Sequence, residues 1–380
     1  MKISIITSFP FPNGKATANR VMVFAEELIK IEQIKNIQIV SSSSDKNNST
    51  EFRPFINITN IQSLPFNKNN LIFRFYRELL ISIRLWITAK QCNANIIIIT
   101  IPSALLLVPI IIFKKPKVLI LDLRDAVWTY LPKGYINNII SFFLKALFKM
   151  ASKKADLIVV TNKNEASLVK TISGESPIIV ANGISSKKLT TYLKIPVKPI
   201  SKQVNLSYIG NVGIAQELEV LISLAERYRA SLNINIIGDG AKLKFLKQEF
   251  ERSKLNNIFF HGSIPPELVE IYMNKADILF AQIGNNFSSA IPTKVFEYIA
   301  SGRRVLLGLP NGPAKDIFSK FHGVKIFEVG DVSGLIRSYN EILEVCFDEH
   351  SRQKNIDYLA NDFIREKTIL NLTNKLNEII

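Results

Sequence analysis

The sequence is poor in the residue types that build disulfide frameworks and metal centres. Its 380 residues include only two cysteines, Cys92 and Cys346, which lie far apart in the chain, and three histidines. Two distant cysteines indicate neither a disulfide framework nor a metal site and favour a reducing compartment. The low histidine content argues against a histidine-rich metal cluster. We therefore expect no metal and no cofactor.

Long uninterrupted hydrophobic runs are also scarce. Residues 3–9 are apolar, but the run is short and lacks a small-residue cleavage pattern, so we expect no secretory signal. Residues 96–113 are long enough in principle for one membrane span, but two prolines divide them. They favour a buried strand, a turn and a packed helix. No repeat of 20–50 residues is visible, which argues against a solenoid.

The charge is strongly basic and unevenly distributed. Lys and Arg total 48 against 32 Asp and Glu, which gives a net charge of +16. Residues 1–180 account for +12 of it. A basic half indicates an anionic partner, which could be nucleic acid, an acidic membrane or a phosphorylated substrate. No zinc-finger or RNP-like pattern is present, so we expect no nucleic acid; a membrane or a phosphate remains.

Strand-like runs alternate with helix-like runs along the whole chain. Many of the strand-like runs are almost continuously β-branched, as in parallel strands buried on both faces. This alternation predicts an α/β protein with doubly wound domains. The polar tract 41–50 is predicted to be a loop. Predicted strands are 2–7, 37–41, 96–100, 117–122, 157–161, 177–181, 205–210, 233–237, 257–261, 277–281, 304–308 and 324–328.

The strand series restarts after residue 182, following a stretch with five lysines and two prolines at 185–203. Such a composition is typical of a linker or hinge. We therefore expect two Rossmann-like domains. The predicted bounds are 1–185 for the first domain, 186–203 for the linker, 204–350 for the second domain and 351–380 for C-terminal helices.

The most informative segment is 288–302, Ser-Ser-Ala-Ile-Pro-Thr-Lys-Val-Phe-Glu-Tyr-Ile-Ala-Ser-Gly. Its serines and proline suit the start of a short helix, and Gly302 suits a left-handed end. Val295, Phe296 and Ile299 can face a core.

Lys294 and Glu297 are spaced to lie on the other face of this helix. A cation and a carboxylate beside a helix N-terminus match a sugar nucleotide, because phosphates attract the cation and ribose hydroxyls need an acceptor. The alternative is a surface salt bridge between the two residues.

The segment resembles the donor motif of the retaining glycosyltransferases of family 4, which have the two-domain GT-B fold. The nearest resemblance is to the branch that builds bacterial O-antigen and capsule polysaccharides. The matching positions are Pro292, Thr293, Lys294, Glu297, Tyr298, Ala300 and Gly302.

The resemblance implies two Rossmann-like domains that face each other across a cleft, with the last helices returning to the first domain. It also implies that a sugar from a nucleotide diphosphate, most often UDP, is transferred to a lipid-linked acceptor. The donor would lie mainly in the second domain and the acceptor in the first.

Further loops that follow predicted strands carry the resemblance, among them 236–240, which contains Gly238. Three others are the most informative. They are the glycine-containing loop 8–20, the Arg124-Asp125 pair and the loop 208–216. The alternatives are an ordinary strand–helix turn and a structural Arg–Asp pair. The resemblance implies Gly14, Arg20, Gly210, Asn211, Gly213, Gly238, Ser289, Ala290, Lys294 and Glu297 for donor binding; Lys15, Arg124 and Asp125 for acceptor binding; and Lys294, Glu297 and Asp125 for catalysis.

The chain departs from the family pattern at three points. Ser289 stands where the family has a first glutamate, and Asn211 and Gln216 occupy a loop that often carries an Arg and a Lys. Trp128 comes one residue later than the pattern places it. Charge neutralisation would then depend on backbone dipoles, Lys294 and Arg20.

Residues 67–90 and 136–154 mix aromatic and basic side chains. Basic amphipathic helices of this kind fit anionic lipid surfaces. The alternative is two ordinary core-facing helices with extended lysines.

The sequence therefore predicts a cytoplasmic GT-B glycosyltransferase, peripheral on the inner face of the cell membrane. A sugar-nucleotide 2-epimerase and a non-catalytic subunit that stabilises a partner transferase are the alternatives. An epimerase would need more catalytic carboxylates and histidines than the sequence offers.

Overall fold

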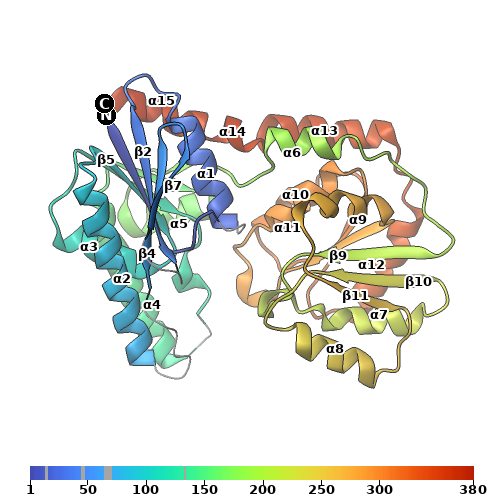
Figure 1. Ribbon diagram of the computed structural model, residues 1–380. Helices are drawn as coiled ribbons and strands as arrows, with labels where there is room; N and C mark the ends of the chain where they lie inside the picture. Colours follow the sequence, from blue (N-terminus) through green and yellow to red (C-terminus); the bar gives the residue numbers. More distant parts are fainter. Residues whose placement is uncertain (13–15, 44–47, 64–70, 132–133) are drawn as a thin grey trace. The chain divides into compact units, whose positions relative to one another are not determined.

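The computed structural model describes residues 1–12, 16–43, 48–63, 71–131 and 134–380. They form two compact units. The first unit comprises Met1–Asn182 and Arg365–Ile380, and the second comprises Gly183–Ile364. Each unit is a mostly parallel sheet with helices on both faces (Figure 1). The predicted α/β class with two Rossmann-like domains is confirmed.

The first unit contains an eight-stranded sheet in the order β3-β4-β2-β1-β5-β6-β7-β8. All described pairs are parallel except β3 with β4. The strands are β1 (Lys2–Thr7), β2 (Asn36–Ser43), β3 (Asn48–Arg53), β4 (Ile56–Gln62), β5 (Ile96–Ile101), β6 (Val118–Leu123), β7 (Leu157–Val160) and β8 (Ile178–Ile179).

Helices cover both faces of this sheet because its central strands are apolar on both sides. Every residue of β5 and of β6 is buried. Side chains of α1 and α15 pack on one face, and those of α2, α3 and α4 pack on the other. The helices are α1 (Ala16–Leu28), α2 (Leu71–Gln91), α3 (Leu107–Ile112), α4 (Tyr135–Ser152), α5 (Lys163–Ser173), α14 (Arg365–Thr368) and α15 (Leu370–Ile379), with 3-10 turns η1 (Ala104–Leu106) and η2 (Val127–Thr129).

The polar tract 41–50 is not the loop that its composition predicts. Strand β2 extends to Ser43 and β3 begins at Asn48, while residues 44–47 lie outside the described residues. In the added strand β4, Ile56 and Ile58 are buried on one face of the sheet and Ile61 on the other. Strands β2 and β3 both form backbone hydrogen bonds with β4. This pairing stabilises them as strands, although the polar side chains of 41–50 are typical of a loop.

The second unit contains a six-stranded parallel sheet in the order β11-β10-β9-β12-β13-β14. Its strands are β9 (Val204–Ile209), β10 (Leu232–Ile237), β11 (Ile258–Gly262), β12 (Ile278–Gln282), β13 (Arg304–Gly308) and β14 (Val324–Phe327). Its helices are α6 (Ser186–Tyr192), α7 (Leu221–Arg227), α8 (Leu243–Arg252), α9 (Val269–Lys275), α10 (Thr293–Ala300), α11 (Pro313–Phe318), α12 (Val332–Glu344) and α13 (Glu349–Asp362), with 3-10 turns η3 (Ile214–Gln216), η4 (Leu218–Val220), η5 (Pro266–Leu268) and η6 (Asn285–Phe287).

The predicted linker 186–203 contains a helix. Helix α6 is capped by Ser185, whose side chain accepts a hydrogen bond from the Lys188 N–H. Leu189, Tyr192 and Ile195 are buried in the core of the second unit. Lysines stand between these buried residues in the sequence. The high lysine content therefore gave no sign that the segment forms an amphipathic helix.

The C-terminal segment 351–380 is divided between the units. Helix α13 belongs to the second unit, whereas α14 and α15 belong to the first. Ile369, Leu372 and Leu376 join the core of the first unit around α1.

Residues 96–113 form β5, η1 and α3, as the prolines predict. Among the described residues, no helix has both the length and the apolar character that a membrane span requires.

Candidate functional site

The second unit changes the direction of its strand order between β9 and β12. In doubly wound sheets, ligands bind beyond the carboxyl ends of the strands at such a point. The loops that follow β9 and β12 meet there, because the Gly284 N–H donates to the Ala215 carbonyl over 2.8 Å. The predicted donor motif follows the β12 loop directly.

Helix α10 forms the core of that motif. Val295, Phe296 and Ile299 are buried, and Gly302 adopts φ +69°, both as predicted. Ser288 and Ser289 do not cap the helix, because α10 begins later, with Pro292 at its N-cap. Within the described chain, no side chain caps this N-terminus. Its first N–H groups are therefore available to an anion.

Tyr298 connects α10 to strand β9. Its hydroxyl donates to the Ile209 carbonyl over 2.8 Å and accepts from the Ile209 N–H over 3.0 Å. The phenol is 1% exposed, so these hydrogen bonds are shielded from water. They place the first residues after β9 beside α10, a function that the sequence pattern did not assign to Tyr298.

Glu297 does not pair with Lys294. Its carboxylate forms an ion pair with Lys188 of α6 at 2.6 Å and accepts a hydrogen bond from the Tyr192 hydroxyl at 3.1 Å. Burial, and then the Glu297 charge, raise the pKa of Tyr192, which keeps this phenol a donor. The surface salt bridge that the spacing allowed is therefore not formed.

Lys294 is half-buried and has no hydrogen-bond or ion-pair partner among the described residues. Burial lowers the pKa of its ammonium group, whereas the nearby Glu297 carboxylate raises it. Lys188 and Lys294 together exceed the charge of Glu297. The site therefore carries a local positive charge beside an uncapped helix N-terminus, which favours an anionic ligand.

The predicted glycines lie in loops that pack backbone to backbone. A Cβ at Gly238 would come 1.7 Å from the Gly210 carbonyl oxygen, and Gly238 adopts φ +143°. The Gly213 N–H already donates to the Gln216 side chain over 3.0 Å, while Asn211 is exposed. Gly210 and Gly238 therefore allow close packing of the loops after β9 and β10, and Asn211 offers a polar side chain.

The segment before α10 folds into η6 and a turn. The Phe287 N–H donates to Gly284, and the Ala290 N–H donates to the Phe287 carbonyl. Both amides are engaged within the loop, including that of Ala290, which the resemblance assigns to donor binding. Ser288 packs its backbone against Gly312, where a Cβ would come 2.2 Å from the Ser288 oxygen.

In the first unit, the strand order changes direction between β1 and β5. A cavity of about 840 Å³ opens there. Its lining includes Ser8 after β1, Ser103 after β5 and Val127 of η2, but neither Arg124 nor Asp125. Gly14 and Lys15 lie outside the described residues.

Arg20 forms an ion pair and hydrogen bonds with other residues of the first unit. Its guanidinium forms an ion pair with Asp122 at 2.7 Å and donates to the Val180 carbonyl and the Asn182 side chain. Arg20 is 5% exposed and Asp122 is 0% exposed. These contacts hold the Arg20 guanidinium within the first unit, and its contact with a donor stays a prediction. A lone aspartate within the apolar strand β6 was the signal for this pair.

Arg124 and Asp125 do not form the Arg–Asp pair that we considered. Arg124 donates to the Thr17 hydroxyl, and its buried Nε has no partner in the described residues. Burial, and then Arg20, lower the pKa of Arg124. Asp125 is half-buried and accepts a hydrogen bond from Tyr130 at 3.1 Å. Asp125 is the more accessible member of this group.

Glu165 is a buried carboxyl group that sequence reasoning missed. Its side chain accepts hydrogen bonds from the Thr161 N–H and hydroxyl, and its own N–H donates to Asn162 at the N-cap of α5. Burial raises the pKa of Glu165 to about 8. The helix-capping pattern Asn162-x-x-Glu165 was visible in the sequence.

His261 lies in the edge strand β11 and not at either point where the strand order changes direction. Its ring nitrogens contact Asn235 at 2.9 Å and Tyr272 at 3.4 Å. Both ring nitrogens of His261 therefore have partners within the second unit.

A family model matches most of the second unit. Residues 194–358 match the model described as "Glycosyl transferases group 1". This range includes all six strands of the second sheet and helix α10. The second unit is therefore similar to the glycosyltransferase group 1 family over most of its length. No curated protein matches the sequence significantly.

Solved structures match both units together. The sucrose-phosphate synthase of Thermosynechococcus elongatus aligns with a TM-score of 0.77 at 14% identity, covering 100% of this chain and 98% of that chain. The lipopolysaccharide outer core galactosyltransferase WaaB, in its apo form, aligns with a TM-score of 0.64 at 14% identity, with 98% of each chain covered.

A third structure, Anabaena HepE in complex with UDP and glucose, aligns with a TM-score of 0.66 at 12% identity, with 99% of each chain covered. Identities this low establish the fold alone. The chain has the GT-B fold, as the resemblance in its motifs implied.

Glu165 makes the stability of the first unit dependent on pH. Unfolded Glu165 loses its proton above about pH 4.5, whereas the folded residue keeps it up to about pH 8. Raising the pH through this window therefore favours unfolding, by on the order of 3–5 kcal/mol. Glu165→Gln should lose this dependence and be the more stable protein at pH 8.5, as measured by thermal denaturation from pH 5 to 8.5.

The exposed Glu175, just beyond α5, provides the control. Glu175→Gln should keep the pH profile of the unchanged protein. Parallel profiles for the unchanged protein and Glu165→Gln would show that Glu165 titrates at its ordinary pKa.

Proposed function

We propose that this chain is a retaining glycosyltransferase. It moves a sugar from a nucleotide diphosphate sugar, with UDP as the favoured carrier, to a lipid-linked glycan acceptor. The pathway that we propose is surface polysaccharide synthesis of the O-antigen or capsule type. The family match and the GT-B fold support the reaction class.

One observation carries the proposal: the unpaired Lys294 beside the uncapped N-terminus of α10. These groups lie at the switch point of the second sheet, where an anionic donor would bind. The departing diphosphate gains negative charge during transfer. A fixed cation and fixed N–H dipoles stabilise that charge more than the charge of the ground state.

Glu297 would bind the ribose hydroxyls. Its two oxygens accept from Lys188 and Tyr192, and a carboxylate has lone pairs for about four hydrogen bonds, so it can accept two more. Retention needs no protein nucleophile in this scheme. The acceptor hydroxyl attacks the face that the diphosphate leaves, and the leaving phosphate takes its proton. Asp125, a half-buried carboxylate that follows β6, would orient the acceptor.

Binding to an anionic membrane is part of the proposal. The first 180 residues carry +12, and α4 contains no acidic residue. Structures with UDP and glucose, or with UDP-2-fluoro glucose, among the similar proteins support a UDP-linked donor. Thermal shift with UDP-, GDP- and dTDP-sugars, followed by transfer to membrane extracts, tests donor and acceptor together.

The first functional prediction concerns Glu297. Glu297→Gln keeps an acceptor for Tyr192 but removes the charge, so donor affinity should fall by about 1.5–3 kcal/mol. Calorimetric titration with UDP-sugar measures it. Lys188→Gln is the matched control, since it removes the same ion pair and leaves the carboxylate. Donor affinity that is unchanged in folded Glu297→Gln would exclude this residue from the site.

The second functional prediction concerns Lys294. Lys294→Met should lower turnover roughly 100-fold, because the partner charge grows in the transition state. Affinity for UMP should change much less than affinity for UDP. Donor hydrolysis and nucleotide titrations measure both quantities. The exposed Lys315 of α11 provides the control variant, Lys315→Met. Equal losses of UMP and UDP affinity would argue against contact with the leaving phosphate.

The third functional prediction concerns the membrane. The protein should co-sediment with vesicles that contain anionic lipid and much less with neutral vesicles, because each basic residue near the surface contributes on the order of 1 kcal/mol. Raising the salt concentration should release part of it. Replacing Arg74, Arg77 and Arg84 with Gln should release the protein without changing nucleotide affinity. Equal sedimentation with both vesicle types would contradict electrostatic docking.

A further inference from the structure

The cavity at the switch point of the first unit has a polar floor. Ser8 accepts a hydrogen bond from the Ser103 N–H at 3.1 Å, and the Ser42 hydroxyl donates to the Ser8 carbonyl. The Ser103 hydroxyl donates to Glu78 of α2 over 3.3 Å. Ser8 follows β1, Ser103 follows β5 and Ser42 lies at the end of β2, so the floor lies along the carboxyl edge of the sheet.

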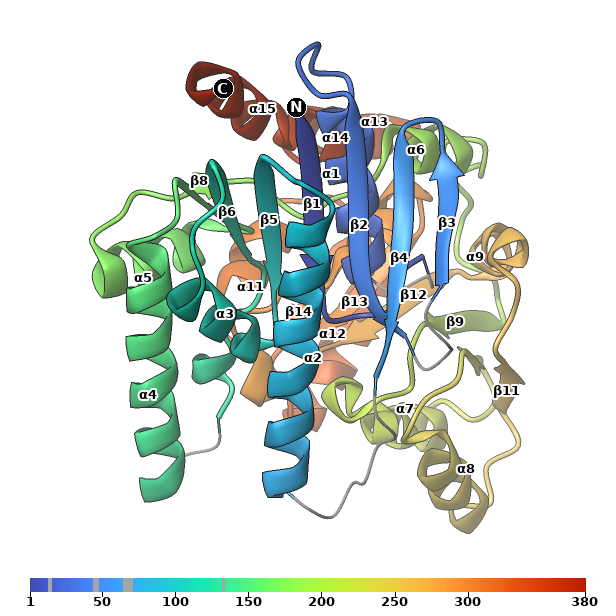
Figure 2. The ribbon, with the colours of Figure 1, turned by 60° about the vertical axis from the view of Figure 1, so that its left-hand side comes forward.

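The walls of the same cavity are apolar and come from two helices. Phe75 and Ile81 of α2 face Ile140, Phe143 and Leu144 of α4 across the cavity. Figure 2 shows the N-terminal parts of both helices extending past the carboxyl ends of the sheet's strands. Toward the C-terminal end of each helix, Trp86 and Phe148 are buried instead. The two helices thus pack on the sheet at one end and enclose an open apolar groove at the other.

Exposed apolar side chains continue from this groove. Phe143 is 65% exposed and Tyr135, farther along α4, is 82% exposed. Such a large exposed apolar surface marks a binding site. On both helices, the apolar surface therefore extends beyond the part that the core of the unit covers.

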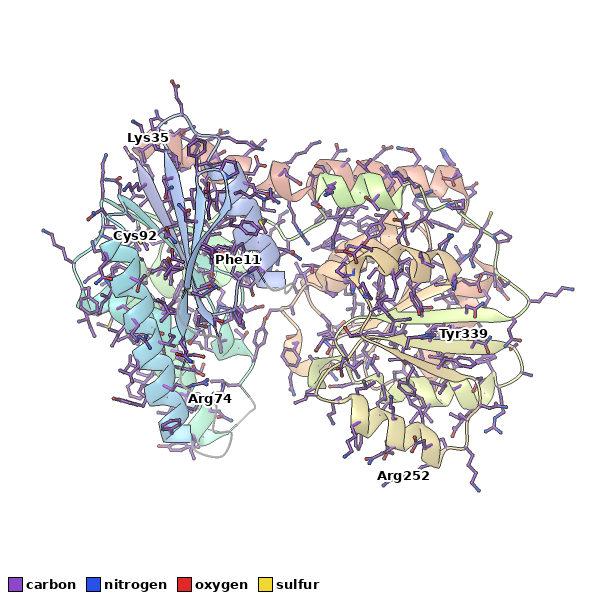
Figure 3. The ribbon with its side chains drawn as sticks, in the orientation of Figure 1. Phe11, Lys35, Arg74, Cys92, Arg252 and Tyr339 are labelled. Atoms are coloured by element: carbon purple, nitrogen blue, oxygen red, sulfur yellow. The ribbon has the colours of Figure 1, made fainter. Side chains whose placement is uncertain are left out.

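The groove also carries positive charge at one end. Arg74 and Arg77 of α2 line the cavity beside Glu78, which Arg74 contacts at 3.1 Å. Figure 3 labels Arg74 near the free end of α2. With one carboxylate against two guanidinium groups, the mouth has a net positive charge. An anionic group would be held there and a hydrocarbon chain between the helices.

We infer that this groove binds a single amphiphile with an anionic phosphate head, with its hydrocarbon chain between α2 and α4 and its phosphate at Arg74 and Arg77. The identity of this amphiphile as the acceptor carrier rests on the proposed function. The binding site itself rests on the cavity, its apolar walls and its charge.

Charge complementarity favours this occupant over two others. A second copy of the chain would bring Arg77, Arg84, Lys145 and Lys149 against the same basic groups, and like charges repel. A bilayer could cover the exposed tips, but a cavity of about 840 Å³ lined by Ser8, Ser42 and Ser103 as well as by apolar side chains is suited to a single molecule.

The test compares Phe143→Ala with Tyr135→Ala by calorimetric titration with farnesyl phosphate below its aggregation concentration. Both residues are exposed aromatics on α4, but only Phe143 lines the cavity. Phe143→Ala should bind about tenfold more weakly, which corresponds to roughly 1.4 kcal/mol. Tyr135→Ala should stay within about twofold, even if both variants bind vesicles less well.

A second pair tests the phosphate. Arg77→Gln should weaken farnesyl phosphate but not farnesol, whereas Arg84→Gln should change neither, because Arg84 donates to the Gln62 carbonyl outside the cavity. Equal effects of Phe143→Ala and Tyr135→Ala would reduce the groove to a bilayer-facing surface and overturn the inference. Failure of the unchanged protein to bind farnesyl phosphate would overturn it as well.

UDP-sugar binding, measured in the same preparations, separates the two proposals. Farnesyl phosphate binding without any nucleotide binding would sustain the groove and reject the transferase. Nucleotide binding without farnesyl phosphate binding would do the reverse.

Discussion

The buried hydrogen bonds between Tyr298 and Ile209 position the candidate donor site. A hydroxyl that donates to and accepts from the same residue fixes both the distance and the orientation of α10 relative to β9. In a shielded site, an unpaired polar group would cost on the order of 1–3 kcal/mol, so this contact resists displacement. The loop after β9 and the N-terminus of α10 are therefore held together in the absence of a ligand.

The charges around α10 follow from this placement. Because α6 packs beside α10, Lys188 and Tyr192 reach Glu297, and Lys294 is left without a partner. A half-buried cation without a counter-ion is costly, and a phosphate removes that cost on binding. The same arrangement explains how a chain with Ser289 at the first glutamate position still presents a site suited to an anion.

The first unit separates buried charge from its open cavity. Arg20 pairs with Asp122 and Arg124 donates to Thr17 inside the fold, and burial raises the pKa of Glu165 there. The cavity between α2 and α4 instead exposes aromatic walls and serine hydroxyls. The charged residues to which the sequence analysis drew attention thus stabilise the carboxyl edge of the sheet. The aromatic and serine side chains of the cavity form the surface that a ligand can reach.

The sequence by itself determined the α/β class, the domain number, twelve strands and the apolar face and glycine end of α10, because these depend on local periodicity and backbone preference. The sequence did not predict the hairpin-like pair β3 and β4, because polar strands are stabilised by pairing with their neighbours and not by their own apolar pattern. Tertiary structure alone decided that Glu297 pairs with Lys188, that Arg20 pairs with Asp122 and that Phe143 lines a cavity. Each depends on which distant side chain arrives within a few ångströms, and sequence spacing carries no information about that distance.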